Sequence, residues 1–316
     1  MTIDSSRGIA GLKGALRYVR AYRDHVFVVK LGGDVLSDAE VQDHVAEQLG
    51  LLQSLGIRIV VVHGGGPQAS ALLRRLGQEP VMVAGRRVTD DAALEVAKMV
   101  YPGLLSTELL AALRSHQVQA VGLSGVDADL LTAHRRPPVS VKADDGTVSL
   151  VDYGHVGDID RVDPRIVHTL VENRFVPVVA SLAADDEGNV YNVNADTVAE
   201  TLAIALKAQK LIFLTGAPGV LRDRNDPSSL VTFADPDDLE QLLASGVIAG
   251  GMRPKVEACL RAATGGVERT HIIDGRSHDS LLLEVFTGSG TGTMIVGRKE
   301  KATYLGVDLA DGDRAS

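Results

Sequence analysis

The chain has 316 residues, of which 45% are hydrophobic and 23% charged, enough to bury one large core or two lobes. A net charge of −9 without a basic block argues against a nucleic-acid partner. No apolar run reaches about 18 residues, so we expect no membrane contact. Met1 to Gly14 contains no secretory signal, and Cys259 is the only cysteine. These features favour a cytoplasmic location.

The chain begins with a helical pattern at residues 8–23, which precedes the first strand and is expected to be an appendage helix. The apolar run 26–31 is typical of a buried parallel strand, and Lys30 with two glycines stands at its carboxyl end. Ligands of open α/β sheets bind beyond such ends, so Lys30 is a candidate phosphate ligand. Ser37 to Glu40 then matches a capping box, and Gly56 should end the helix that follows.

The most informative stretch is the strand 57–62, with His63, three glycines and Pro67 behind it. Glycines allow a ligand to lie directly on the backbone, and proline suits the first turn of a helix. The N–H groups of that turn favour an anion. A tight turn without a ligand is the alternative for this stretch taken alone.

The middle of the chain alternates further helices and strands with two hairpins. We expect helices at 91–100 and 104–115, separated by Pro102, and a strand at 118–123. Asp-Gly in 139–158 and the turn near Asp185 predict hairpins that form lids over a site. Asn194 or Asp196 could cap the helix that follows, but a cap accounts for only one of the polar residues at 192, 194 and 196.

The last third continues the alternation, with strands at 210–215, 270–274 and 293–297. Lys255 lies in the first turns of a helix, where it opposes the helix dipole, so an anion contact would explain it. The fold predicted is α/β: an open, mainly parallel sheet in an α/β/α sandwich, with hairpin lids. We expect an oligomerisation helix at 1–24, an N-lobe at 25–176 and a C-lobe at 177–316.

The glycine-and-lysine loops together predict a polyphosphate site. Neither the Walker A pattern nor G-x-G-x-x-G after the first strand is present. Ser124 matches a nucleophile elbow only in part, and the histidines show no metal-ligand spacing. Phosphoryl transfer depends on positioning and on neutralising charge, which lysines and helix N-termini can provide.

At this point the chain resembles the amino acid kinase family, most closely its arginine-sensitive N-acetylglutamate kinase branch, between about residues 17 and 297. The motifs that carry the resemblance are KLGG (30–33), VVHGGGPQ (61–68), GRRVTD (85–90), YNVNADTVAE (191–200), GGMRPKV (250–256) and HIIDGRSHDSLLLEVFTGSGTGTMI (271–295). The resemblance implies ATP-dependent phosphorylation of the side-chain carboxylate of N-acetyl-L-glutamate in arginine biosynthesis. Mg²⁺ would accompany ATP, and no protein metal site is expected.

The resemblance also implies roles for individual residues. Lys30 and Lys255 would stabilise charge on the transferred phosphoryl group, and Asp196 would orient both. The acyl amino acid would be bound by Gly64, Gly65, Gly66, Arg87, Asn192 and Ala195. The nucleotide would be bound by Gly32, Gly33, Thr215, Gly216 and Gly219. Because the nucleophile is already an anionic carboxylate, no general base is required.

Within the same branch, the N-terminal helix interlaces dimers into a hexamer, and arginine binds beside it. The corresponding positions here are Tyr18, His271, Glu284 and Gly290. We therefore expect feedback inhibition by arginine and a hexamer built from dimers.

Three positions depart from the family pattern. Asp34 follows K-x-G-G, the segment 105–108 replaces a V-N-K segment, and Gly216 replaces the aspartate of an L-T-D loop. These departures leave alternatives open: a kinase for a related N-acylated amino acid, a kinase-like relative of acetylglutamate synthase, or a non-catalytic arginine sensor.

Overall fold

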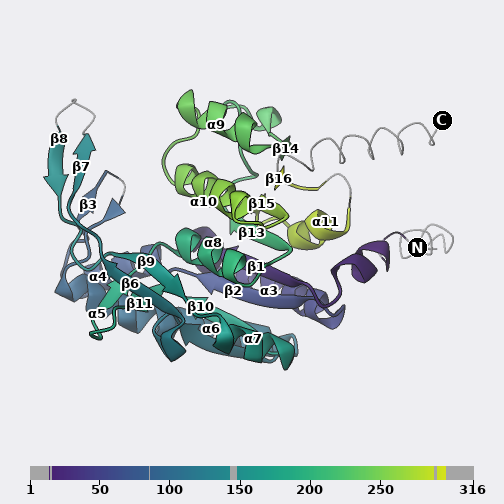
Figure 1. The fold of residues 1–316 in the computed structure, drawn as a ribbon, viewed down its shortest axis with the longest axis horizontal. Helices are drawn as coiled ribbons and strands as arrows, with labels where there is room; N and C mark the ends of the chain where they lie inside the picture. Colours follow the sequence, from purple (N-terminus) through teal and green to yellow (C-terminus); the bar gives the residue numbers. More distant parts are fainter. Residues whose placement is uncertain (1–13, 15, 85, 143–147, 288–289, 297–316) are drawn as a thin grey trace.

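The computed structural model describes residues 14, 16–84, 86–142, 148–287 and 290–296 (Figure 1). The described strands include an eight-stranded sheet, which is parallel except between β15 and β16. Its order is β14 (Phe233–Ala234), β16 (Thr293–Val296), β15 (Arg269–Asp274), β13 (Lys210–Thr215), β1 (Val26–Leu31), β2 (Arg58–His63), β10 (Val176–Ala180) and β5 (Ala120–Ser124). The predicted open, mainly parallel sheet is confirmed.

Helices cover both faces of this sheet because its strands are apolar on both sides. Val28 of β1 packs with one set of helices, and Phe27 and Val29 pack with the other. The first set is α7 (Arg165–Glu172), α8 (Ala195–Ala205) and α10 (Met252–Thr264), with α9 (Pro236–Ala244) packed outside it. The second set is α2 (Gly33–Leu36), α3 (Ala39–Ser54), α6 (Ser106–Ser115) and α11 (Ser280–Phe286). The α/β/α sandwich is therefore confirmed.

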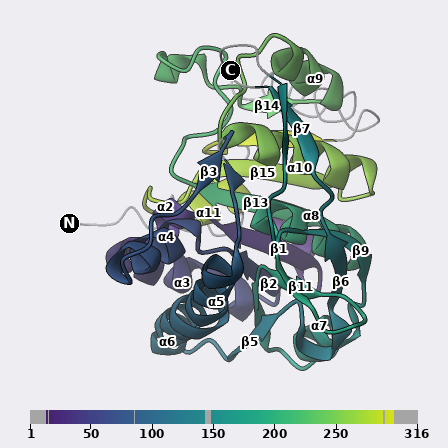
Figure 2. The ribbon, with the colours of Figure 1, turned by 90° about the vertical axis from the view of Figure 1, so that its left-hand side faces the viewer.

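Smaller sheets and hairpins lie beside the main sheet. One has the order β12 (Val190–Asn192), β11 (Leu182–Ala184), β6 (Leu131–Arg135) and β9 (Gly157–Val162). Two hairpins are β3 (Met82–Val83) with β4 (Arg86–Arg87), and β7 (Val139–Lys142) with β8 (Val148–Val151). Both hairpins extend from the side of the molecule that carries α4 (Gly66–Arg75) and α5 (Asp91–Met99) (Figures 1 and 2).

The structure corrects two local predictions. The N-cap of α3 is Asp38, whose carboxylate accepts hydrogen bonds from the N–H groups of Glu40 and Val41, whereas Ser37 donates to the carbonyl of Gly33. The expected capping box is therefore wrong by one residue. Pro102 does not separate two helices, because the wider turns of a π-helical segment, Val100–Leu105, accommodate it between α5 and α6.

That continuous helix, Asp91–Ser115, is long and apolar enough by length and composition to cross a membrane. It packs within the fold, however, as core helices of soluble proteins do, with Leu109 and Leu113 fully buried in the same cluster as α3.

Some predicted features fall partly outside the described residues. These are residues 8–13 and 15 of the appendage helix, Gly85 of GRRVTD, the Asp-Gly turn of the first hairpin, and residues 288–289 of the last motif. Residues 16–22 are helical, as expected. The main sheet is continuous across both proposed lobes, and β10, which starts at the proposed boundary, pairs with β2 and β5.

Candidate active site

The structure brings Lys30, Asp196 and Lys255 together from three different elements. Lys30 lies near the carboxyl end of β1, Asp196 in the first turn of α8 and Lys255 in the first turn of α10. Lys30 Nζ is 2.7 Å from one carboxylate oxygen of Asp196, and Lys255 Nζ is 3.2 Å from the other. One carboxylate therefore holds two ammonium groups, and the catalytic role that the resemblance implies for these residues stays a prediction.

Burial disfavours the charged forms of the side chains in this cluster. It lowers the pKa of Lys30, while Asp196 opposes that shift. Burial also opposes the ionisation of Asp196, but the two lysines outweigh it and hold the pKa of Asp196 below its usual value. Two ammonium groups around one carboxylate leave a net positive charge, which suits a phosphoryl group.

Asn194 is the N-cap of α8, and its side-chain oxygen accepts hydrogen bonds from the N–H groups of Asp196 and Thr197. The Asp196 side chain is thereby free to face the lysines instead of capping its own helix. The alternation at 192, 194 and 196 thus places a structural residue between two candidate functional ones.

The predicted glycine loops approach one another closely beside this cluster. A Cβ on Gly33 would lie 2.8 Å from the Pro67 ring, and a Cβ on Gly32 would lie 2.9 Å from the Leu214 carbonyl oxygen. A Cβ on Gly64 would lie 3.3 Å from that of Ala195. The loops after β1, β2 and β13 therefore touch each other and the start of α8 at one edge of the sheet.

Not every glycine leaves its backbone open to a ligand. The N–H of Gly32 donates to the Leu214 carbonyl at 2.8 Å. A Cβ on Gly65 would lie 2.5 Å from both Leu105 and Tyr101, so this glycine is required by the helix packed against it. The first N–H groups of α2 and α4 have no partner within their own helices, so they are candidates to bind an anion.

Of the predicted substrate residues, Arg87 contacts Gly66, and Asn192 contacts Thr89, two residues after Arg87. Arg87 Nη2 donates to the carbonyl of Gly66 and to Ser70 Oγ, the latter at 2.6 Å. Asn192 Nδ2 donates to Thr89 Oγ1 at 3.2 Å. Contacts with the second glycine loop and α4 thus position the guanidinium of Arg87, which the resemblance expects to bind a substrate carboxylate.

The residues predicted to bind nucleotide follow β13. Thr215 Oγ1 bonds within its own turn, accepting from the Ala217 N–H at 2.9 Å. A Cβ on Gly219 would lie 2.6 Å from Thr293 Oγ1, which accepts from the N–H of Val220. A Cβ on Gly216 would lie 2.5 Å from Asp34 Oδ2. Thr215 therefore stabilises the loop through its side-chain hydroxyl, and the two glycines allow neighbouring atoms to approach the loop closely.

The side chain of His63, which sequence reasoning passed over, is fully buried at the end of β2. Its Nδ1 is 2.9 Å from the Gly64 carbonyl oxygen, and Nε2 has no hydrogen-bond partner among the described residues. Burial, with a smaller contribution from the charge of Lys30, lowers the pKa of His63 to about 4 in spite of the contact with the Gly64 carbonyl. The ring is therefore neutral at physiological pH and adds no charge to the site.

The four positions predicted for arginine gather on the opposite face of the sheet. His271 Nδ1 is 2.6 Å from Glu284 Oε1, and a Cβ on Gly290 would lie 2.9 Å from Glu284 Oε2. The Tyr18 ring packs edge-on against Phe286, two residues after Glu284 on α11, with ring centroids 6.5 Å apart. Burial opposes ionisation of Glu284, but His271 and backbone N–H groups of the 291–292 segment hold its pKa at about 2.

Lys210 joins this cluster and was not predicted. Its Nζ is 3.0 Å from His271 Nε2 and 5.1 Å from the centroid of the Tyr22 ring. Burial lowers the pKa of Lys210 to about 7 and that of His271 to about 4. A lysine at the start of an apolar strand resembles an ordinary strand end, so only the fold reveals these partners.

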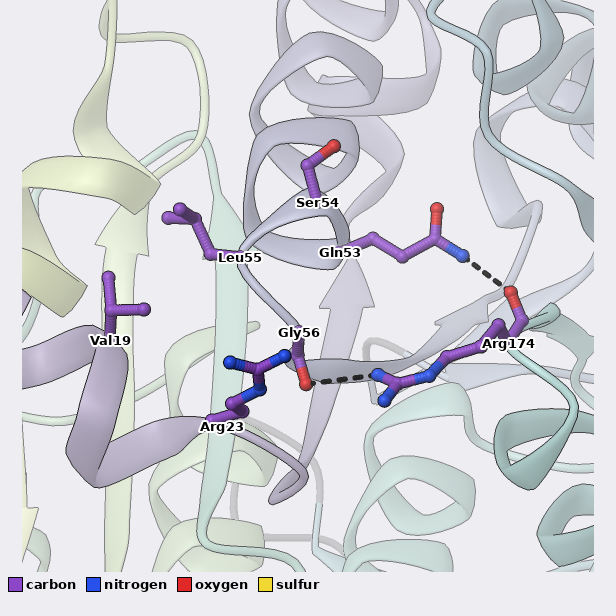
Figure 3. Close-up of a pocket in the computed structure, with 7 residues that line it drawn as sticks. All are labelled: Val19, Arg23, Gln53, Ser54, Leu55, Gly56 and Arg174. Atoms are coloured by element: carbon purple, nitrogen blue, oxygen red, sulfur yellow. Dashed lines mark hydrogen bonds between the residues drawn. The ribbon is translucent and has the colours of Figure 1, made fainter.

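A surface pocket of about 490 Å³ lies at the amino ends of the parallel strands (Figure 3). Arg174 forms one wall, pairing with Asp24 and donating to the Gly56 carbonyl at 3.4 Å. Arg23, directly after the helix 16–22, points toward the same space. Because the pocket lies where the strands begin, it is distinct from the lysine cluster at their carboxyl ends.

Comparison with known proteins extends these observations. A family model described as the amino acid kinase family matches residues 25–274. The chain belongs to the amino acid kinase family. An acetylglutamate kinase of Myxococcus xanthus (strain DK1622) is 50% identical over 91% of this chain and 94% of its own length. An acetylglutamate kinase of Methanosphaera stadtmanae is 42% identical over 89% of this chain and 94% of its own length. The predicted family, and with it an enzyme of the acetylglutamate kinase type, is confirmed.

Solved structures of amino acid kinase folds also match. The N-acetylglutamate synthase of Neisseria gonorrhoeae in complex with coenzyme A and N-acetyl-glutamate aligns with a TM-score of 0.77 at 28% identity. Its complex with coenzyme A and L-arginine aligns with a TM-score of 0.76 at 25% identity. The chain is covered to 91% in both cases but spans only 63% and 65% of the synthase chains.

Proposed function

We propose that this kinase transfers the γ-phosphoryl group of ATP to the side-chain carboxylate of N-acetyl-L-glutamate, as a step of arginine biosynthesis. The observation that carries the proposal is the buried Lys30–Asp196–Lys255 cluster, where two ammonium groups share one carboxylate beside bare glycine loops. The name of relatives at 42–50% identity supports this acceptor.

The chemistry requires charge stabilisation rather than a base. The acceptor carboxylate oxygen forms a bond to phosphorus while the bond between phosphorus and the bridging oxygen breaks, leaving ADP and an acyl phosphate. No proton is transferred, because the nucleophile is already an anion. Lys30 and Lys255 would neutralise charge on the moving group, and Asp196 would keep both lysines in place as their partners change.

The acceptor would lie against the Gly64–Gly66 loop and contact the side chains of Arg87 and Asn192. Arg87 still has donors beyond the Nη2 that it uses internally, so it can bind one substrate carboxylate. The nucleotide would lie across Gly33 and the loop 215–219. Both substrates then meet at the lysine cluster, with the acyl amino acid in the N-lobe and ATP in the C-lobe.

ATP-dependent phosphoryl transfer implies Mg²⁺, which would neutralise charge on the phosphates. In the described part of the chain, no group of three or more His, Cys, Asp or Glu side chains could hold a metal ion. Mg²⁺ in such sites is typically held by substrate phosphates, water and one or two carboxylates. The sparse donor set therefore fits a cation that arrives with the nucleotide.

A substrate panel tests the proposal and its runner-up. ADP release should depend on N-acetylglutamate and be at least about tenfold slower with N-succinylglutamate or N-acetyl-aminoadipate, because an added methylene or acyl change costs ~1–3 kcal/mol in a shaped pocket. A preference for another acyl group would make this enzyme a kinase for a related N-acylated amino acid. Arginine binding without turnover would instead indicate a non-catalytic sensor.

We further propose feedback inhibition by arginine at the Tyr18–His271–Glu284–Gly290 cluster, and a hexamer assembled from dimers through the N-terminal helix. The buried Glu284, whose pKa is held at about 2, and the packing of Tyr18 against Phe286 of the same helix α11 support a guanidinium site. The arginine complex of the Neisseria synthase supports the same ligand class.

Deletion of the segment before Ala21 should leave dimers and abolish arginine inhibition, while activity without arginine persists. Light scattering and arginine titration measure the two effects. An intact hexamer after the deletion would contradict the assembly proposal.

A further inference from the structure

The β3–β4 hairpin, which carries Arg87, is too short to hold its own position. Each strand contributes two residues, and Arg87 lies opposite Met82. An isolated two-stranded hairpin is at best marginally stable in water, so contacts with the rest of the fold must fix this one. The position of the Arg87 guanidinium therefore depends on the residues that hold the hairpin.

Tyr153 holds this hairpin from the turn that follows β8. Tyr153 is 2% exposed, and its hydroxyl donates to the Val83 carbonyl at 3.2 Å. The Tyr153 carbonyl accepts from the N–H of Thr89, two residues after Arg87, at 2.9 Å. One residue thus contacts the hairpin on both sides, β3 through its side chain and the segment after β4 through its backbone.

The same turn contacts Asn192, the other side chain expected to bind the acceptor. The His155 N–H donates to the Thr89 carbonyl at 2.7 Å, and the His155 carbonyl accepts from the Asn192 N–H at 2.9 Å. Thr89 is fully buried, and its Oγ1 is the acceptor of the Asn192 Nδ2 bond. Gly154 has a φ of +71°, and a Cβ there would collide with the Thr89 carbonyl. The turn at 153–155 is therefore a tightly packed connection between the hairpin and Asn192.

We propose that Tyr153 is a positioning residue for the acceptor. It holds the β3–β4 hairpin where Arg87 can bind a substrate carboxylate, and its turn fixes Asn192 relative to Arg87. The inference rests on the proposed function, in which these two side chains bind the acyl amino acid. Loss of the Tyr153 hydroxyl should weaken acceptor binding and leave phosphoryl transfer unchanged, because the lysine cluster is formed by β1, α8 and α10.

Steady-state kinetics of Tyr153→Phe tests this role, since the variant keeps the buried ring and removes only the hydroxyl. The KM for N-acetylglutamate should rise about three- to tenfold, the scale of one lost neutral hydrogen bond, while kcat and the KM for ATP stay within about twofold. Tyr191→Phe is the matched control, because Tyr191 is also buried but its hydroxyl donates to Asp185 at 2.7 Å. It should leave all three constants within about twofold.

A double-mutant cycle tests whether Tyr153 acts through Arg87. Arg87→Gln should itself lower kcat/KM for N-acetylglutamate, which the initial slope gives even without saturation. In the Arg87→Gln background, Tyr153→Phe should lower kcat/KM by less than about twofold, because the hairpin then carries no guanidinium to position. Additive losses, or an unchanged kcat/KM in Arg87→Gln, would overturn the inference.

Thr89→Val provides a second, independent variant. It keeps a side chain of similar size and removes the oxygen that accepts from Asn192, so the KM for N-acetylglutamate should rise. This variant decides the matter if Tyr153→Phe does not fold. An unchanged KM in Tyr153→Phe, or an equal rise in Tyr191→Phe, would overturn the inference and leave the kinase proposal intact. Wild-type protein without turnover of N-acetylglutamate would overturn the proposed function and this inference with it.

Discussion

The sheet buries two lysines on adjacent strands, and their surroundings differ in an instructive way. Lys30 points from β1 toward the face covered by α8 and α10, and Lys210 points from β13 toward the face covered by α11. Lys30 contacts an ionised carboxylate directly at 2.7 Å. Lys210 contacts the neutral ring of His271, which in turn contacts Glu284.

The difference determines what each cluster can do. Around Asp196 the two lysines hold the carboxylate ionised, and Asp196 in turn opposes the effect of burial on the charge of Lys30. Around Lys210 the positive charge is only partly stabilised, because burial brings its pKa to about 7. The charge of a buried lysine on a strand is therefore stabilised to a different degree, depending on whether its ammonium group contacts a carboxylate.

The largest expected effect is a loss of turnover when the cluster around Asp196 is changed. Lys255→Ala should lower kcat by about two or more orders of magnitude, because a charge contact to the transferred group is lost. Arg253→Ala is a matched control in the same turn of α10, where Arg253 pairs with Glu257 and is largely exposed. Near-normal turnover in Lys255→Ala would remove that lysine from the mechanism.

The second effect should appear only in regulation. Glu284→Gln should weaken arginine inhibition about tenfold or more, as expected when a charge-assisted hydrogen bond to a guanidinium is lost. The kcat without arginine should stay within about twofold. Glu268→Gln, which changes an exposed carboxylate beside β15, is the control, and an arginine titration of activity measures both variants. A fall in basal kcat equal to that of Lys255→Ala would mean that the clusters are not separate.

The smallest effect concerns pH and stability. The folded pKa of Lys210 lies below its usual value, so between about pH 10.5 and 7 the unfolded state binds a proton that the folded state does not. Stability is therefore lost as pH falls through this window, by up to about 1.4 kcal/mol per pH unit. Lys210→Met should be more stable than the wild type at pH 7.5.

Urea denaturation at pH 7.5, 8.5 and 9.5 measures that difference, which should shrink as pH rises. A difference that stays constant across the three pH values would show that Lys210 does not change its charge in the folded protein, and would contradict this account.

The sequence predicted the fold, and it singled out Lys30 and Lys255, for a physical reason. Buried parallel strands are continuous apolar runs, and a polar residue at their carboxyl ends stands out, as Lys30 does. Lys255 was recognisable because its place at a helix N-terminus is unfavourable without an anion. Local sequence patterns of this kind are sufficient to predict most of the helices and strands of the main sheet.

Features that depend on contacts distant in the chain were missed. The strands β6 and β9 are short and partly polar, and only their pairing defines them. Ser37 and Asp38 are equally good caps by type, and the helix start decides between them. The meeting of Asp34 with Gly216 joins residues 182 positions apart, and only the fold brings them together.

Trapping of the product tests the central claim most directly. The enzyme is incubated with ATP, Mg²⁺, N-acetylglutamate and hydroxylamine, which converts an acyl phosphate to a hydroxamate. We predict that hydroxamate and ADP form in equal amounts and that Lys255→Ala lowers both together. ADP without hydroxamate, or neither product, would contradict phosphoryl transfer to the side-chain carboxylate.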